Sequence, residues 1–335
     1  HRALGGHDWY AQGAAELVRR QQTDGGWGDD VDTAYALAFL AAGRRAVLVS
    51  KLHYDGLWNG RPRDLANLAA WLGRRFERPF RWQVLDIDAP PSFWRQTPVL
   101  YISGASAPAF TDEQIARLRD YALGGGLIVS DAARSSAAFN VGMLKVYRRM
   151  FPDRPIEPIA PDHPLFSAHR PLEAPMKLHG ISNGVRLLAV HSPADLSKAW
   201  HLRQADRRAD AFQLAANLYF HATDLGEFRR QADAMDAAGA EPARIERTVR
   251  VARLDHAGNP APEPAAYGRL VEHMARQCAL RVELSEPIPI AALPAETYAA
   301  ALMTGTEAFE LSEADRRALR AFVNACTHRG AALTG

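Results

Sequence analysis

Short apolar runs alternate with amphipathic segments along most of this chain. The runs are rich in β-branched residues and have strand-like lengths, whereas the segments between them show helical apolar spacing. Between residues 47 and 130 these patterns predict strands at 47–50, 83–87, 99–103 and 127–130 and helices at 64–75 and 112–123. Continuous apolar strands that alternate with helices predict a three-layer α/β fold, with a parallel sheet covered on both faces.

The same order of segments recurs in the last third of the chain. The corresponding segments are 249–258, 265–278, 280–284, 300–305 and 311–322, and 329–335 parallels the glycine-rich step into the strand at 127–130. This repetition predicts one supersecondary plan used twice, with the second unit incomplete or degenerate. We also expect the strand order second, first, third, fourth, which is flavodoxin-like.

The pattern divides the chain into four parts. They are a helical hairpin at 1–45, a complete α/β domain at 47–225, a helical linker at 226–247 and a second, partial α/β copy at 248–335. Within the complete domain we also expect a helix near 141–150, a proline-rich loop at 152–164, a late strand at 185–190 and a closing helix at 209–221. The two copies are expected to pack against each other within the molecule.

The N-terminal part predicts two helices, 11–20 and 32–42, joined by Gln21-Gln-Thr-Asp-Gly-Gly-Trp-Gly28. This turn resembles the glutamine-tryptophan repeat of the terpene cyclase and protein prenyltransferase toroids. Asp29, Asp30 and Asp32 lie where carboxylates cap a helix, so we interpret them as caps and not as a cyclase acid. One helix pair cannot enclose an apolar cavity, so a terpenoid-handling function would require further helices.

Composition predicts a soluble globular protein. Of the 335 residues, 47% are hydrophobic, and the formal net charge is only +2. This charge gives no reason to expect nucleic acid as a partner, and no apolar run approaches the roughly 20 residues that span a bilayer. Because the chain begins at His1, we expect a piece of a longer protein, extracytoplasmic if a signal sequence precedes it.

Several motifs of the first copy occur in the order found in a known family. They are Lys51-Leu-His-Tyr-Asp-Gly-Leu-Trp-Asn-Gly-Arg-Pro-Arg-Asp-Leu-Ala-Asn-Leu68, Gly124-Gly-Gly-Leu-Ile-Val, Met150-Phe-Pro-Asp153, Pro161-Asp-His-Pro-Leu-Phe166 and His191-Ser-Pro-Ala-Asp-Leu-Ser197 with Trp200. Over 47–225 the chain resembles bacterial family 4159 of the domains of unknown function. That family is similar to the class I glutamine amidotransferase-like fold, which includes trehalose-utilisation-type proteins. The resemblance implies the fold and leaves activity open.

Amidotransferase chemistry requires a thiolate on the tight turn after a strand. The corresponding turn here is Ser130-Asp-Ala-Ala-Arg-Ser135, which contains no cysteine, whereas members of the family often have cysteines near it. Cys278 and Cys326 lie in predicted helices on opposite faces of the second sheet. We therefore interpret them as buried small hydrophobes without a disulfide, and the chain is not a cysteine-dependent glutamine amidotransferase.

Ligands of open α/β sheets bind beyond the carboxyl ends of the strands. In the first copy this edge gathers the following candidate ligand-binding residues: His53, Tyr54, Asp55, Ser103, Gly104, Ser106, Asp131, Arg134, Ser135 and, from the proline-rich loop, His163. Each of these types also serves in turns and loop anchors. The second copy retains Asp255, His256 and Thr304-Gly305, but proline replaces other elements, so any chemistry is expected in the first copy.

Two hypotheses follow. The leading one is a non-catalytic or weakly catalytic binding and scaffolding module that recognises a small polar ligand or a protein partner. The alternative is a hydrolase or metal-dependent enzyme acting on a sugar-like or amide substrate. It would use a triad of Ser103 or Ser135 with His163 and Asp131, or a metal held by His53, Asp55, Asp131 and His163. No elbow motif or close ligand spacing supports either set, and no cofactor is indicated.

Overall fold

The computed structural model describes residues 3–4, 7–43, 47–94, 97–174, 176–223, 245 and 247–332. The chain divides into two compact units, one made of His1–Ser182 with Leu187–Ala238 and the other of Asn183–Arg186 with Gly239–Gly335. The predicted linker at 226–247 lies almost wholly outside the described residues. Each unit has its own sheet and its own apolar core.

The N-terminal segment forms a short strand pair, β1 (Ala3–Leu4) with β2 (His7–Asp8), and then two helices, α1 (Trp9–Arg20) and α2 (Asp30–Gly43). The turn between the helices is tied by the indole nitrogen of Trp27, which donates to the carbonyl oxygen of Leu17 at 2.6 Å. Asp29 accepts hydrogen bonds from the amides of Val31 and Asp32, which makes it the cap of α2.

The first unit is built on a seven-stranded sheet. Its strands in spatial order are β4 (Arg81–Asp86), β3 (Val47–His53), β5 (Val99–Gly104), β6 (Leu127–Ala132), β9 (Leu187–Ser192), β8 (His179–Ser182) and β7 (Glu157–Pro158). The first four strands of this sheet in chain order, β3 to β6, have the expected spatial order second, first, third, fourth. Strands β4, β3, β5, β6 and β9 are parallel, whereas β8 is antiparallel to β9 and β7 is antiparallel to β8. The sheet is therefore mixed, because the segment around the proline-rich loop adds two short strands that the sequence did not predict.

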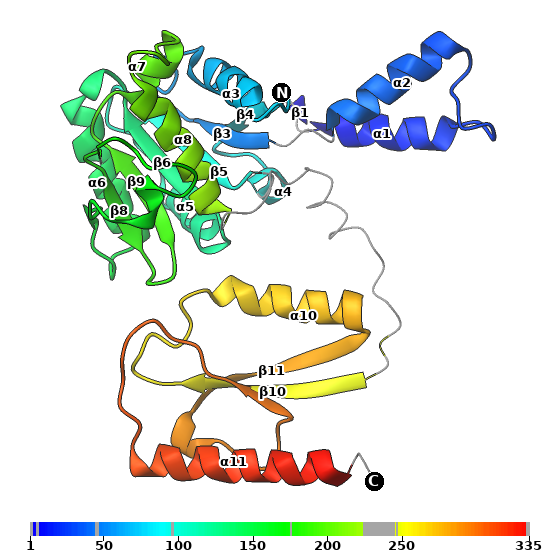
Figure 1. Ribbon diagram of the computed structural model, residues 1–335, viewed down its shortest axis with the longest axis vertical. Helices are drawn as coiled ribbons and strands as arrows, with labels where there is room; N and C mark the ends of the chain where they lie inside the picture. Colours follow the sequence, from blue (N-terminus) through cyan, green and yellow to red (C-terminus); the bar gives the residue numbers. More distant parts are fainter. Residues whose placement is uncertain are drawn as a thin grey trace. The chain divides into compact units, whose positions relative to one another are not determined.

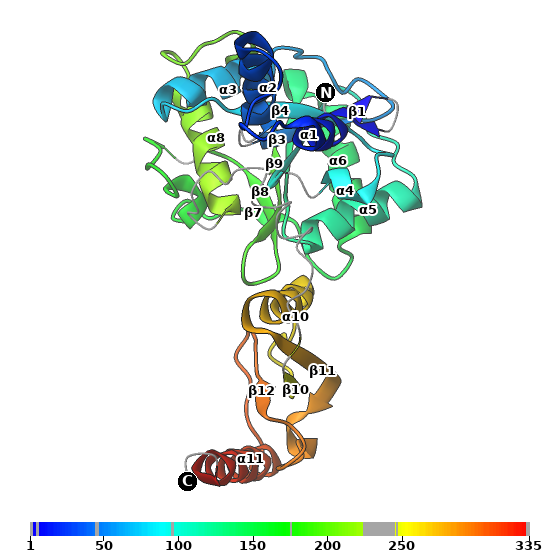
Figure 2. The same ribbon diagram turned by 90° about the vertical axis from the view of Figure 1, so that its right-hand side faces the viewer.

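Helices cover both faces of this sheet (Figures 1 and 2). One face packs against α3 (Asp64–Arg75), α7 (Leu196–His201) and α8 (Ala209–Ala222). The other packs against α4 (Pro91–Trp94), α5 (Asp112–Leu123) and α6 (Ala137–Met150). Every residue of β5, β6 and β9 is buried, as expected for central strands between two helical layers.

Helix α5 shows how local sequence sets the boundaries of an element. Thr111 and Gln114 form a reciprocal capping box at its start. At its end lies the glycine-rich step that leads into the next strand: the amide of Gly124 bonds to the carbonyl of Asp120, and Gly125 has φ +105°, so the helix stops there. The chain then enters β6 directly, which carries Asp131 to the carboxyl edge of the sheet.

The second unit has a parallel three-stranded sheet in the order β11 (Leu280–Pro289), β10 (Arg247–Asp255), β12 (Ala300–Leu302). Its helices are α10 (Pro264–Cys278) and α11 (Glu313–Ala332). The buried cluster of this unit includes Phe322 of α11, whereas α10 contributes no buried residue.

Two predictions for this unit are wrong. Helix α11 continues to Ala332, so 329–332 does not enter a strand; a single glycine there replaces the three that stop α5. Cys278 is exposed and Cys326 is half-buried, so neither is a fully buried hydrophobe, although both are free and lie on helices as expected. The exposure of Cys278 follows from the lack of a core beside α10. In the part of the chain that the structure describes, no helix has both the length and the apolar character to cross a membrane.

Candidate binding site at the carboxyl edge of the sheet

The floor of the site is a buried ion pair between β3 and α3. The Nζ atom of Lys51 lies 2.7 Å and 2.9 Å from the two carboxylate oxygens of Asp64. It also donates to the side chain of Asn59 and to the carbonyl oxygen of Arg61. Burial lowers the pKa of Lys51 and raises that of Asp64, and the attraction between the two charges opposes both shifts. The pair fixes the loop that carries Arg61.

A second buried carboxylate, Asp131, ends the central strand β6. Its Oδ1 accepts the amide of Leu196 at 2.9 Å, and its Oδ2 accepts the amide of Ser197 and the hydroxyl of Tyr101, both at 3.1 Å. Burial raises the pKa of Asp131 to about 6, although these amides oppose the shift. Asp131 therefore points under α7 and holds the start of that helix.

Asp195, the N-cap of α7, joins the loops above this floor. Its Oδ2 accepts the side chain of Arg61 at 2.6 Å and the amide of Arg134 at 2.8 Å, while its Oδ1 accepts the amide of Lys198 and the hydroxyl of Ser197. Burial alone would raise the pKa of Asp195, but the hydrogen bonds from Arg61, Arg134 and Ser197 lower it overall. Four donors occupy the acceptor sites of this carboxylate.

These contacts enclose a pocket of about 450 Å³. Its lining combines four cationic side chains with one carboxylate and one hydroxyl: Arg61, Arg134, Ser135, Ala194, Asp195, Lys198 and Arg208. Arg208 also pairs with Asp210, whereas within the described residues the side chains of Arg134 and Lys198 form no ion pair. The pocket is therefore strongly cationic.

The backbone at the pocket is strained. Arg134 and Ser135 have φ of +59° and +51°, in the left-handed region that side chains rarely adopt. Such conformations cost of order 1–3 kcal/mol each and cluster at ligand sites, where the surrounding structure over-determines them. Here the bond from the Arg134 amide to Asp195 holds the turn, and Arg134 and Ser135 both line the pocket.

Of the ten predicted site residues, the structure brings only Arg134 and Ser135 into this pocket, with Asp131 supporting it from below. Tyr54 is buried and donates to the carbonyl of Ser103 at 3.1 Å. A Cβ at Gly104 would lie 2.6 Å from the ring of Phe139, so this glycine permits packing. Tyr54, Ser103 and Gly104 are thus interior residues and do not line the pocket.

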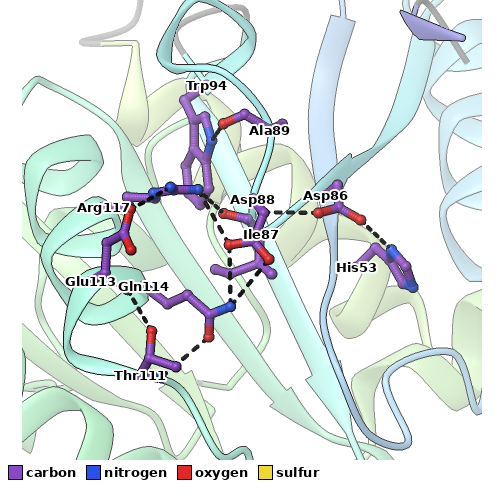
Figure 3. Close-up of polar contacts among 10 residues, drawn as sticks. All are labelled: His53, Asp86, Ile87, Asp88, Ala89, Trp94, Thr111, Glu113, Gln114 and Arg117. Atoms are coloured by element: carbon purple, nitrogen blue, oxygen red, sulfur yellow. Dashed lines mark hydrogen bonds and ion pairs between the residues drawn. The ribbon is translucent and has the colours of Figure 1, made fainter. Parts of the chain in front are cut away.

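His53 lies apart, at the end of β3, where its Nδ1 is 2.7 Å from Oδ2 of Asp86 (Figure 3). Asp86 also accepts the amide of Asp88, and Asp88 accepts hydrogen bonds from Gln114 and Arg117 of α5. About half of the His53 side chain is exposed. This cluster ties the end of β4 to α5 and presents the imidazole to solvent.

Asp55 and Ser106 lie on surface loops after β3 and β5, where Asp55 is exposed and Ser106 half-buried. His163 caps the short turn η2 (Pro164–Phe166) by accepting the amide of Leu165, and its ring contacts His221 of α8. Thus His163 is a loop anchor. This is the structural role that we gave above as the alternative to ligand binding. Among the described residues His163 forms no hydrogen bond with Ser103 or Ser135, so neither proposed serine triad is assembled.

The four residues considered as metal ligands also do not form a set. In the described part of the chain, no three histidine, cysteine, aspartate or glutamate side chains are placed to share a metal ion. His53 faces Asp86, Asp131 faces α7, and His163 faces His221. The fourth residue, Asp55, lies exposed on a loop.

Sequence reasoning missed Lys51, Arg61, Asp64 and Asp195. The signal for Lys51 is a lysine inside an apolar strand, since a buried charge must be paired. Asp195 precedes a helix as a capping residue would, in Pro193-Ala-Asp-Leu-Ser. Arg61 carries no local signal, because its partner is 134 residues away in the chain.

The comparisons with known proteins assign the domain to a family. Residues 47–223 match Domain of unknown function (DUF4159), and the chain belongs to that family. The comparison with curated proteins found no match. Among solved structures, the exo-beta-1,4-mannosidase Op5Man5 from Opitutaceae bacterium strain TAV5 is similar at 16% identity and a TM-score of 0.30. That match covers 57% of this chain and 38% of the mannosidase, and it is too distant to bear on fold or function.

Proposed function

We propose that the first unit is a non-catalytic or weakly catalytic module that binds a small anionic ligand in the pocket at the carboxyl edge. The observation that carries this proposal is the cationic lining formed by Arg61, Arg134, Lys198 and Arg208. Asp195 offsets one of these four positive charges, so the lining keeps a net positive charge, and its oxygens are already occupied by four donors. Arg61 is fixed at the pocket by its 2.6 Å contact with Asp195, so its guanidinium group is held in place before a ligand binds.

The groups in the pocket favour binding over catalysis. Asp195 is held ionised by its donors and has no free oxygen with which to accept a proton. Ser135 shares the lining with no histidine or cysteine that could activate it. Phosphate or carboxylate groups are the ligands that clustered arginine and lysine side chains recognise.

The enzyme hypothesis retains one supporting observation, the pair of His53 and Asp86. A carboxylate on Nδ1 orients an imidazole so that Nε2 can act as a base. A hydrolase acting on a sugar-like or amide substrate would use this pair at the same edge of the sheet. Substitution of His53 by Gln would then abolish turnover and leave anion binding in the pocket unchanged.

We also propose that the two sheets are copies of one glutamine amidotransferase-like plan. Each copy repeats one tertiary contact: Tyr54 donates to the carbonyl of Ser103, and Nε2 of His256 lies 2.8 Å from the carbonyl oxygen of Thr304. In both copies a glycine follows that carbonyl and lies against the ring, and a capping box opens the next helix. In the second copy His256 also stacks on Phe309, which supports a filled, degenerate edge.

The N-terminal helices are proposed to be a toroid-type pair. The support is the tied turn, in which Trp27 binds Leu17 and the side chain of Gln21 donates to the carbonyl of Gly25. In such a protein the α/β units would act as a binding and scaffolding appendage.

The experiment that tests the binding proposal is calorimetric titration with inorganic phosphate, citrate and glucose. We expect the two anions to bind and glucose not to bind. Lys198→Ala and Arg134→Asn should each weaken anion binding by about tenfold, or 1.4 kcal/mol; asparagine tolerates the left-handed backbone at position 134. Arg119→Ala, which removes an exposed charge on α5, is the control. Binding of glucose alone, or equal losses in the control, would contradict the proposal.

A further inference from the structure

We infer that the ligand of this site is a linear oligomer with anionic groups along its length, because a second cationic pocket lies at the other end of α7. This inference rests on the proposed anion-binding function. The second pocket has a volume of about 420 Å³ and is lined by Arg63, Asn67, His201, Leu202 and Arg203. It differs from the first in drawing on the C-terminal end of α7 and the start of α3.

The backbone of Arg63 and the guanidinium group of Arg203 are held in place at the second pocket. Asn67 donates to the carbonyl oxygens of Trp200 and His201 and accepts the Nε of Arg203 at 2.9 Å. The amide nitrogen of Arg63 donates to Nδ1 of His201 at 3.3 Å, so Nε2 carries the proton of the neutral ring and can donate. In the described residues, the guanidinium groups of Arg63 and Arg203 form no ion pair.

The same two segments contribute to both pockets: the loop that carries Arg61 and Arg63, and helix α7 with the residues that flank it. Arg61 reaches Asp195 at the start of α7, and Arg63, two residues later, reaches His201 at its end. Helix α7 has six residues, which corresponds to a length of about 9 Å. A ligand that fills both pockets must therefore extend along this helix.

The charge along this path is concentrated. The linings of the two pockets contain six arginine or lysine side chains and one carboxylate, that of Asp195, whereas the whole chain has a formal net charge of only +2. Favourable interaction with the helix C-terminus accounts for a basic residue such as His201. The same interaction accounts for Lys198, which is also in the last turn of this short helix. It does not account for Arg134, which lies outside α7 and lines the first pocket.

The chemistry of the linings narrows the ligand class. No tryptophan, tyrosine or phenylalanine lines either pocket, so there is no stacking platform of the kind that binds single-stranded nucleic acid. Guanidinium groups at intervals match phosphate or carboxylate oxygens. Linear polyphosphate and acidic oligosaccharides share this chemistry.

The test compares three probes: inorganic phosphate, linear polyphosphate and oligogalacturonate. Polyphosphate or oligogalacturonate should bind at least about tenfold more tightly than phosphate, which is 1.4 kcal/mol. Arg63→Ala and Arg203→Asn should remove this gain and leave phosphate binding within about twofold, because phosphate needs only the first pocket. Arg134→Asn should weaken all three probes, and Arg119→Ala should weaken none. The oligomer that binds more tightly shows whether the anionic groups of the ligand are phosphates or carboxylates.

Two failures are distinguishable. If phosphate and citrate do not bind the unmodified protein, the proposed function itself is wrong. If they bind and depend on Arg134, but Arg63→Ala and Arg203→Asn leave oligomer binding unchanged, the extended ligand is wrong and only the first pocket is used. Equal losses in Arg119→Ala would also overturn the inference, because they would show non-specific attraction to surface charge. Thermal unfolding of each variant checks that it is folded.

Discussion

Lys51 and Asp64 form an ion pair of 2.7 Å in which both side chains are at least 98% buried. The same ammonium group bonds to Asn59 and to the backbone of Arg61, so the pair connects the core of the sheet to the loop that supplies Arg61 and Arg63. A charge inside the apolar layer thus determines where two arginines of the cationic edge are placed.

Removal of one partner of this pair should be strongly destabilising. We expect Lys51→Met to lower the free energy of unfolding by about 3–5 kcal/mol, because it leaves the Asp64 carboxylate buried without a counter-charge. Urea denaturation measures the change. The double variant Lys51→Met with Asp64→Leu should recover most of the loss; equal instability of the single and double variants would show that packing, and not charge, is responsible.

Asp131 should make the folded protein more stable as the pH falls. Its folded pKa of about 6 lies above its ordinary value of 3.8, so between these values the folded state binds more protons than the unfolded state. The contribution amounts to roughly 3 kcal/mol, gained as the pH falls from about 6 to about 4. Unfolding of the protein and of Asp131→Asn at both pH values tests this, since the stability of the variant should fall by about this amount relative to the unmodified protein between pH 6 and pH 4.

His191 should have the opposite effect. It is buried, with its Nδ1 2.7 Å from the hydroxyl of Ser130 and its Nε2 3.0 Å from the side-chain oxygen of Asn140. Burial lowers its pKa from 6.5 to about 4, with His179 adding to the shift. The stability this neutral ring contributes is present above pH 6.5 and is lost as the pH falls to about 4, by roughly 3 kcal/mol.

The comparison of His191→Gln with the unmodified protein checks this prediction. The variant should be less sensitive to acid between pH 6.5 and 4, and the gain from Asp131 should then become visible. If both proteins lose the same stability over this range, His191 is not the group that responds.

Gly104→Ala should destabilise the first unit by about 1–3 kcal/mol, because the added methyl group would overlap Tyr54 and Phe139 in a packed core. Gly60 provides a matched control, since a Cβ there meets nothing within 4 Å. The two alanine variants can be compared by urea denaturation. Equal stability of both would show that the core at Gly104 can rearrange.

The local elements could be predicted closely from the sequence. Helices α3 and α5 have the bounds that the apolar spacing predicts, and the glycines that follow α5 stop it. The strand order β4-β3-β5-β6 also follows, because right-handed crossovers restrict how successive parallel strands can pair. The segment before β9 was less predictable, since β7 and β8 are short, and β8 pairs with β9 while β7 pairs with β8.

The sequence by itself determined the family and the α/β plan, because apolar periodicity, turn residues and motif order are properties of neighbouring positions. The candidate site was decided by tertiary structure. His53, Tyr54 and Asp131 all follow or end strands, yet one faces solvent, one is buried in the core and one supports α7. Arg61 and Asp195 meet across 134 residues of chain, and contacts of that separation depend on how the loops close over the sheet, which no local pattern encodes.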